Sequence, residues 1–219
     1  MTEVFESVWG EVIRIYKDDW KKHIEESEDG GLDSFPARFF SESDLETEFL
    51  CLLRGEFRKN SFKNGHITVK NQFRFGYSTF GDLPELAQRI KRLKHRLEVE
   101  TEQNSFVPDI GVDAARKDDN DPFLIFAELK YWPEVALFHK NVQEMSKKEQ
   151  GDVRRLRTQC QMLQLAVEEK VCKNAFLCII CDGYASGNVM RQVLDSIKND
   201  FKNLHFLIDG MPLNEKIRC

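Results

Sequence analysis

Apolar side chains recur every three or four residues in the first part of the chain. They form one stripe, made of Val4, Phe5, Val8, Trp9, Val12, Ile13, Tyr16, Trp20 and Ile24. This period predicts a long amphipathic helix over residues 3–28, ended by a linker that contains glycine and proline. We expect the aromatic stripe to pack on the protein core or on a second subunit.

The rest of the chain alternates between helical and strand-like patterns. Helical spacing occurs at residues 41–57, 82–97, 151–169 and 189–199. Strands are predicted at residues 65–76, 97–102, 106–115, 123–132, 174–184 and 204–209. The run at 174–184 is apolar throughout, which is typical of a strand covered on both faces. This order predicts an α/β fold with a central mixed sheet flanked by helices, in which residues 67–73 and 97–102 compete to form the first sheet strand.

Composition narrows the class of protein. The chain has 219 residues, of which 41% are hydrophobic and 32% charged, and no run approaches the roughly 20 apolar residues of a spanning helix. Its acidic start lacks the basic and apolar blocks of a signal peptide. Cys178 and Cys181 form a C-x-x-C inside an apolar run, without a second pair at zinc-site spacing. We therefore expect a soluble, cytoplasmic protein with reduced, structural thiols and no membrane partner.

Charge is distributed unevenly along the chain. The net charge is −5, but residues 1–50 hold 14 acidic and 5 basic side chains, and the remainder holds 23 acidic and 27 basic ones. Basic residues cluster at 54–74, 88–96 and 151–157. Such clusters are suited to a phosphate backbone, although solvated helix faces explain each of them equally well.

The predicted strand at 123–132 carries charge on an apolar background. Strand alternation places Leu124, Phe126, Glu128 and Lys130 on one face, with the two charged residues roughly 7 Å apart. Burying a charge is costly unless it is paired or bound to a metal. One interpretation is a surface ion pair worth under about 1 kcal/mol. The other is a site in which the two charges do chemistry.

Asp109 extends this pattern, because it lies on the preceding strand and adjoins Glu128 if the register fits. Two converging carboxylates repel each other unless a cation lies between them. Magnesium prefers carboxylate and carbonyl oxygens, so the carbonyl of Leu129 is a candidate third ligand. The other interpretation of Asp109 is a turn or strand-end residue.

The two segments together resemble a known motif. Pro108-Asp109 and Glu128-Leu129-Lys130 are similar to the motif of the PD-(D/E)xK nuclease superfamily. The resemblance covers about Ser41 to Asp209 and implies a restriction-endonuclease-like core. It implies Asp109 and Glu128 as ligands of Mg²⁺, with Mn²⁺ as a substitute, and Lys130 as the catalytic lysine.

These families usually carry a further acidic residue on the helix before the sheet. Glu46 is our candidate for this catalytic carboxylate, with Glu42 and Glu48 as substitutes. Ser43 and Glu46 also have the spacing of a capping box, which by itself explains a glutamate at this position.

The helix after the lysine strand often bears a glutamine or basic residues that face the site. Gln159, Gln161 and Arg155 are therefore candidates for substrate binding, with a solvated helix face as the alternative. Asp113 shares the facing of Asp109 and is either a second acidic contact or a solvated strand end.

The function that the resemblance implies is a metal-dependent nuclease. We expect an endodeoxyribonuclease that hydrolyses phosphodiester bonds by a metal-activated water, with DNA as its partner and a homodimer as a further expectation. The predicted organisation is a helix and linker at 1–35 and a nuclease-like domain at 36–219, with an insertion near 58–95. The alternative is a non-catalytic nucleic-acid-binding or scaffold protein that retains the fold.

Overall fold

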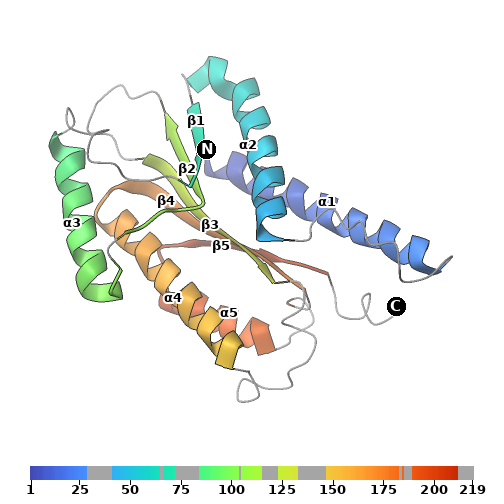
Figure 1. The fold of residues 1–219 in the computed structure, drawn as a ribbon. Coiled ribbons are helices and arrows are strands. Elements are labelled where there is room, and N and C mark those ends of the chain that lie inside the picture. Colours follow the sequence, from blue (N-terminus) through green and yellow to red (C-terminus); the bar gives the residue numbers. More distant parts are fainter. Residues whose placement is uncertain are drawn as a thin grey trace.

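The structure is a computed structural model, which describes residues 1–28, 41–64, 67–72, 84–103, 105–114, 123–132, 147–182, 184 and 189–211. Within these ranges, helices and strands alternate around one sheet (Figure 1). The helices are α1 (Thr2–Glu28), α2 (Glu42–Asn64), α3 (Pro84–Thr101), α4 (Lys147–Glu168) and α5 (Val189–Asp200). The strands are β1 (Ile67–Asn71), β2 (Ile110–Ala114), β3 (Phe123–Trp132), β4 (Cys172–Cys181) and β5 (His205–Asp209).

The sheet is mixed, and its strands lie in chain order from β1 to β5. β1, β2 and β3 pair antiparallel, whereas β3, β4 and β5 pair parallel through the crossover helices α4 and α5. β4 is an interior strand, and every residue from 175 to 181 is buried. The predicted α/β class, the mixed sheet and the doubly covered strand are thus confirmed.

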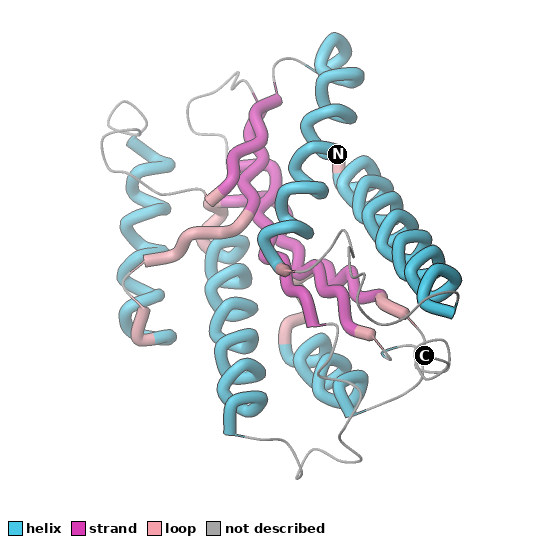
Figure 2. The backbone as a smooth tube through the Cα atoms, turned by 45° about the vertical axis from the view of Figure 1, so that its right-hand side comes forward, coloured by secondary structure: helices cyan, strands magenta, loops and turns pink. Residues whose placement is uncertain are grey.

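Two helical layers cover the sheet, as the backbone trace shows (Figure 2). On one face, α3, α4 and α5 pack on strand residues that include Phe126, Leu177 and Ile179. On the other face, α1 and α2 pack on the alternate residues, among them Ala127 and Cys178. Strand alternation therefore divides the core into two clusters, one on each side of the sheet.

The aromatic stripe of α1 packs on the core of its own chain. Phe5, Val12 and Tyr16 are at most 1% exposed, and the Phe5 ring lies 5.0 Å from Phe49 and 4.4 Å from Phe176, centroid to centroid. Full burial of each such side chain contributes about 1.5–3 kcal/mol. This packing removes the stripe as a basis for the expected homodimer.

Residues 97–102 do not form the predicted strand, because α3 continues to Thr101. Leu97 is buried at helical spacing from Leu93, whereas Val99 is 69% exposed. Arg96 also pairs with Glu100 one turn later. The apolar–polar alternation of this segment therefore reflects a helix surface, and the first strand is β1. The predicted linker at 29–36, and with it the boundary between residues 35 and 36, lies outside the described residues, as do parts of the 58–95 insertion.

Cys178 and Cys181 belong to the core rather than to a site. They point into the two different core clusters, since three residues of β-strand reverse the facing. Both are free, and burial raises the pKa of each thiol above its ordinary value. None of the helices in the described ranges is long and apolar enough to cross a membrane.

A buried carboxylate ties α1 to the ends of β4 and β5. Asp182 is fully buried, and it accepts hydrogen bonds from the Tyr16 hydroxyl at 2.7 Å and from the Met211 amide at 2.6 Å. Burial and the neighbouring Asp182 raise the pKa of Tyr16, which keeps its hydroxyl a donor.

We expect Tyr16→Phe to lower the free energy of unfolding by about 1–3 kcal/mol, because it removes a donor from a buried carboxylate. Tyr184→Phe is the control, since its hydroxyl bonds Asp195 at a half-buried position and its loss should cost about 1 kcal/mol or less. Urea unfolding of both variants measures the difference. Equal losses would contradict a special role for the bond to Asp182.

Candidate functional site

The candidate site lies where β2 and β3 part. Their register pairs Ile110 with Ala127, so Asp109 comes next to Glu128 one residue beyond the last pair. In the described part of the chain, no strand pairs with this side of β3 beyond Ala127. Instead, the Leu129 amide donates a hydrogen bond to Asp109 Oδ2 at 2.8 Å. The Asp109 carboxylate thus accepts the hydrogen bond that a neighbouring strand would otherwise accept. The register that places Asp109 beside Glu128, on which the expected site depends, is confirmed.

Glu128 and Lys130 are buried beside this edge, with residue exposures of 2% and 8%. The Lys130 ammonium donates to the Leu129 carbonyl at 2.7 Å. It also lies 3.7 Å from Glu128 Oε2 and 3.8 Å from Asp109 Oδ2. The interpretation as a solvated surface pair is therefore wrong. Leu124 was expected on the same face of β3 as Phe126, and this expectation is wrong. Leu124 packs against the core cluster on the opposite side of the sheet from Phe126.

Gln159 of α4 holds Glu128 from the other side. Its Nε2 donates to Glu128 Oε2 at 2.8 Å, while its Oε1 is buried without a hydrogen-bond partner in the described structure. Burial, then the charge of Asp109, raises the pKa of Glu128 well above its ordinary value, against the lowering effect of Lys130. Burial by itself would lower the pKa of Lys130, but the surrounding carboxylates outweigh it and raise that pKa.

Two glutamates of α2 approach from the opposite layer. Glu42 and Glu46 are four residues apart and share a helix face. Glu42 Oε1 accepts a hydrogen bond from the Lys130 ammonium at 2.9 Å. Glu46 Oε1 is buried, and no residue in the described ranges donates to it. Burial and the carboxylates of Asp109 and Glu42 raise the pKa of Glu46, which Lys130 lowers.

The cap of α2 differs from the one expected. The helix begins at Glu42, and the Ser41 hydroxyl accepts from the Asp44 amide at 3.3 Å and donates to the Asp44 carboxylate at 2.9 Å. The expected Ser43–Glu46 capping box is therefore wrong. Capping no longer explains Glu46, whose carboxyl lies within electrostatic reach of Asp109 instead.

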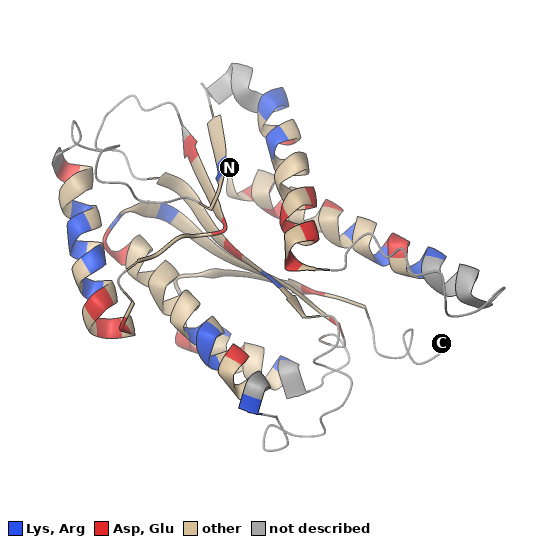
Figure 3. Cartoon of the chain, in the orientation of Figure 1, with Lys and Arg blue, Asp and Glu red and all other residues tan. Residues whose placement is uncertain are grey.

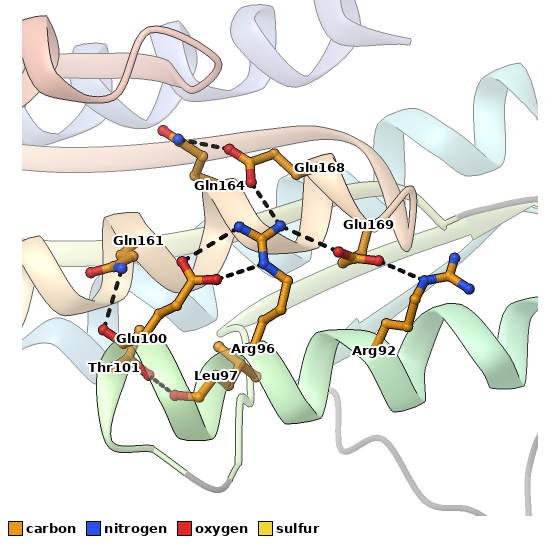
Figure 4. A network of polar contacts seen from close by, with 9 residues as sticks. All are labelled: Arg92, Arg96, Leu97, Glu100, Thr101, Gln161, Gln164, Glu168 and Glu169. Atoms are coloured by element: carbon orange, nitrogen blue, oxygen red, sulfur yellow. Dashed lines mark hydrogen bonds and ion pairs between the residues drawn. The ribbon is translucent and has the colours of Figure 1, made fainter.

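The remaining candidates lie farther from the cluster. Gln161 faces α3, where its Nε2 donates to the Glu100 carbonyl at 3.4 Å, beside the ion pairs that join α3 to α4 (Figure 4). Glu48 is two residues beyond Glu46 and therefore on another face of the helix. Asp113 pairs with Thr68 of β1, roughly 13 Å along the strand from Asp109. Arg155 is exposed and precedes Gln159 by one helical turn on the same face.

The role of Glu42 is only partly predicted by the sequence, which indicates it as a substitute for Glu46. In the structure Glu42 accepts a hydrogen bond from Lys130, and Glu46 lies within electrostatic reach of Asp109. The four-residue spacing of two glutamates at a helix start was the available signal.

The donor chemistry of the cluster suits a hard divalent cation, which takes carboxylate and carbonyl oxygens. Within the described residues, however, no group of three or more His, Cys, Asp or Glu is arranged to hold a metal ion. The acidic side chains surround the Lys130 ammonium rather than a common empty point. Two buried oxygens beside the cluster, Glu46 Oε1 and Gln159 Oε1, have no hydrogen-bond donor among the described residues.

Comparison of the chain with protein-family models, with curated proteins and with solved structures found no match. The geometry and electrostatics of this cluster are therefore the grounds for a functional proposal.

The raised pKa of Glu128 makes stability depend on pH. Above the ordinary value of 4.5 the unfolded chain loses this proton while the folded chain keeps it, so stability falls as pH rises towards the raised pKa. Glu128→Gln should remove this loss, so the difference in melting temperature between the variant and wild type should shift in favour of the variant as pH rises above 4.5.

Thermal melting across this pH range tests the prediction. Glu98→Gln, at an exposed position of α3, is the matched control and should leave the profile unchanged. A variant that is less stable than wild type by a constant amount at every pH would contradict the raised pKa.

Proposed function

We propose that this protein is a metal-dependent nuclease of the PD-(D/E)xK type that hydrolyses phosphodiester bonds, with DNA as the substrate to test first. The observation that carries the proposal is the convergence of Asp109, Glu128 and Lys130 at the uncovered edge of β3, where charge is buried at a cost. A purely structural strand end gains little from three buried ionisable side chains, because apolar side chains of similar volume often replace such groups without loss of stability.

The fold supports the same proposal. An antiparallel β1–β2–β3 unit leads into a parallel crossover through α4, and α2 precedes the sheet, as the resemblance implies for a restriction-endonuclease-like core. The motif residues lie on two neighbouring strands, with Asp109 directly beside Glu128.

Each residue has a role that its contacts support. Asp109, Glu128 and the Leu129 carbonyl would hold Mg²⁺ or Mn²⁺, and Glu46 adds a buried carboxylate nearby. The bound ion would supply Lewis-acid activation of water and of a phosphoryl oxygen. The Lys130 ammonium would offset the negative charge that develops on the phosphate. Gln159 orients the Glu128 carboxylate through its hydrogen bond.

The charge distribution favours one wall of the site for the nucleic acid backbone. Acidic side chains gather in the first turns of α2, whereas the amino-terminal half of α4 carries basic ones (Figure 3). Arg154 and Arg155 are exposed there. A phosphate backbone is attracted to α4 and repelled by the start of α2, so we place the substrate strand along α4.

Cleavage of labelled single-stranded, double-stranded and branched DNA and of matched RNA tests the function. With Mg²⁺ or Mn²⁺, wild type should cut at least one of these substrates, and Lys130→Ala should lower the rate by about 10²–10³-fold through loss of transition-state charge stabilisation. Lys198→Ala, at an exposed position of α5, should cut like wild type.

Equal cutting by wild type and Lys130→Ala would show that the activity lies elsewhere. Binding of nucleic acid without metal and without any cutting would instead support a non-catalytic protein that keeps the fold.

A further inference from the structure

We propose that Lys130 has two positions, and that Glu42 is the residue that retains its ammonium when a divalent cation binds and the ammonium leaves the Leu129 carbonyl. Without a cation, the ammonium bridges Glu42 and the Leu129 carbonyl. With a cation held by Asp109 and Glu128, the ammonium leaves that carbonyl and stays on Glu42. This inference rests on the proposed metal site and adds its regulation by an internal competitor.

The distances show that the ammonium uses the oxygens assigned to the cation. Lys130 Nζ lies 2.7 Å from the Leu129 carbonyl, and 3.8 and 3.7 Å from the carboxylates of Asp109 and Glu128. These are the three proposed ligands. The ammonium therefore acts as the counter-ion of these oxygens in the absence of a divalent cation.

An ammonium and a divalent cation cannot share this position. The repulsion between the two positive charges rises as their distance falls, and little water is present to screen it at a residue that is 8% exposed. The Leu129 carbonyl also has to exchange a hydrogen bond for a metal bond. Cation binding at these ligands thus requires that Lys130 moves.

Glu42 can hold the ammonium in its second position. Its carboxylate already accepts from Lys130 at 2.9 Å, and its side chain is 47% exposed at the first turn of α2. The lysine side chain has four flexible carbons, so its ammonium can swing towards solvent while it keeps this ion pair. Gln159 holds Glu128 independently, so the carboxylate need not follow.

Titration with MnCl₂ in a calorimeter tests the proposal without any need for activity. Lys130→Met keeps the buried stem and removes the competitor, so it should bind Mn²⁺ about tenfold more tightly than wild type or better. Glu42→Gln removes the destination and should weaken binding several-fold. Glu48→Gln removes the same charge from another face of α2 and should leave binding unchanged.

A double-mutant cycle separates the mechanism from a general field effect. In the Lys130→Met background, Glu42→Gln should change Mn²⁺ affinity far less than it does in wild type, because no ammonium needs a destination. An undiminished effect would mean that Glu42 acts on the cation directly, which overturns the assigned role.

Thermal melting gives a second readout. Without a divalent cation, Lys130→Met should melt below wild type, since the carboxylates lose their counter-ion. Added Mn²⁺ should then raise its melting temperature more than that of wild type. If Lys130→Met does not fold without the cation, the Mn²⁺ affinities of Glu42→Gln and Glu48→Gln are compared instead. Equal Mn²⁺ affinities of these two variants would overturn the proposal.

The outcomes distinguish this inference from the proposed function. Equal Mn²⁺ affinity of wild type and Lys130→Met overturns the two-position lysine and leaves the metal site standing. Absence of Mn²⁺ binding in every variant, or binding that persists in Asp109→Asn, overturns the metal site and this inference together.

Discussion

The hydrogen bond from the Leu129 amide to the Asp109 carboxylate closes an edge of β3 that β2 leaves uncovered. Backbone donors inside a sheet need partners, and here a charged side chain provides one. This carboxylate then requires positive charge nearby, which Lys130 supplies. The buried Glu128 beside it is tolerated for the same reason. The end of β2 thus explains why Asp109, Glu128 and Lys130 lie together.

Both layers of the protein hold this cluster in place. α2 packs on one face of the sheet through Phe49 and Leu53, and its first turns bring Glu42 and Glu46 to the site. α4 packs on the other face and contributes Gln159. A site that is held from both sides of a rigid sheet has the fixed geometry that electrostatic catalysis requires.

The sequence revealed the centre of the site because strand patterns are local. An apolar run with two charges at alternate positions defined β3 and placed Glu128 beside Lys130, and one preceding strand was enough to place Asp109. The errors arose where local patterns are ambiguous. Residues 97–102 alternate like a strand, but their burial follows the helix begun by Leu86 and Ile90. The sequence also did not reveal which side chains of α4 point towards the site. Gln159 and Gln161 are two residues apart, and the packing of α4 against β3 and α3 decides that Gln159 bonds Glu128 and Gln161 bonds Glu100.

The proposed function depends on a divalent cation that binds at the edge of β3 that β2 leaves uncovered. Crystals soaked in MnCl₂ and measured at a wavelength where manganese scatters anomalously test it most directly. We expect an anomalous peak within bonding distance of the carboxylates of Asp109 and Glu128, with the Lys130 ammonium displaced from the Leu129 carbonyl towards Glu42. Absence of a peak there at saturating Mn²⁺, with Lys130 still bonded to that carbonyl, would contradict it.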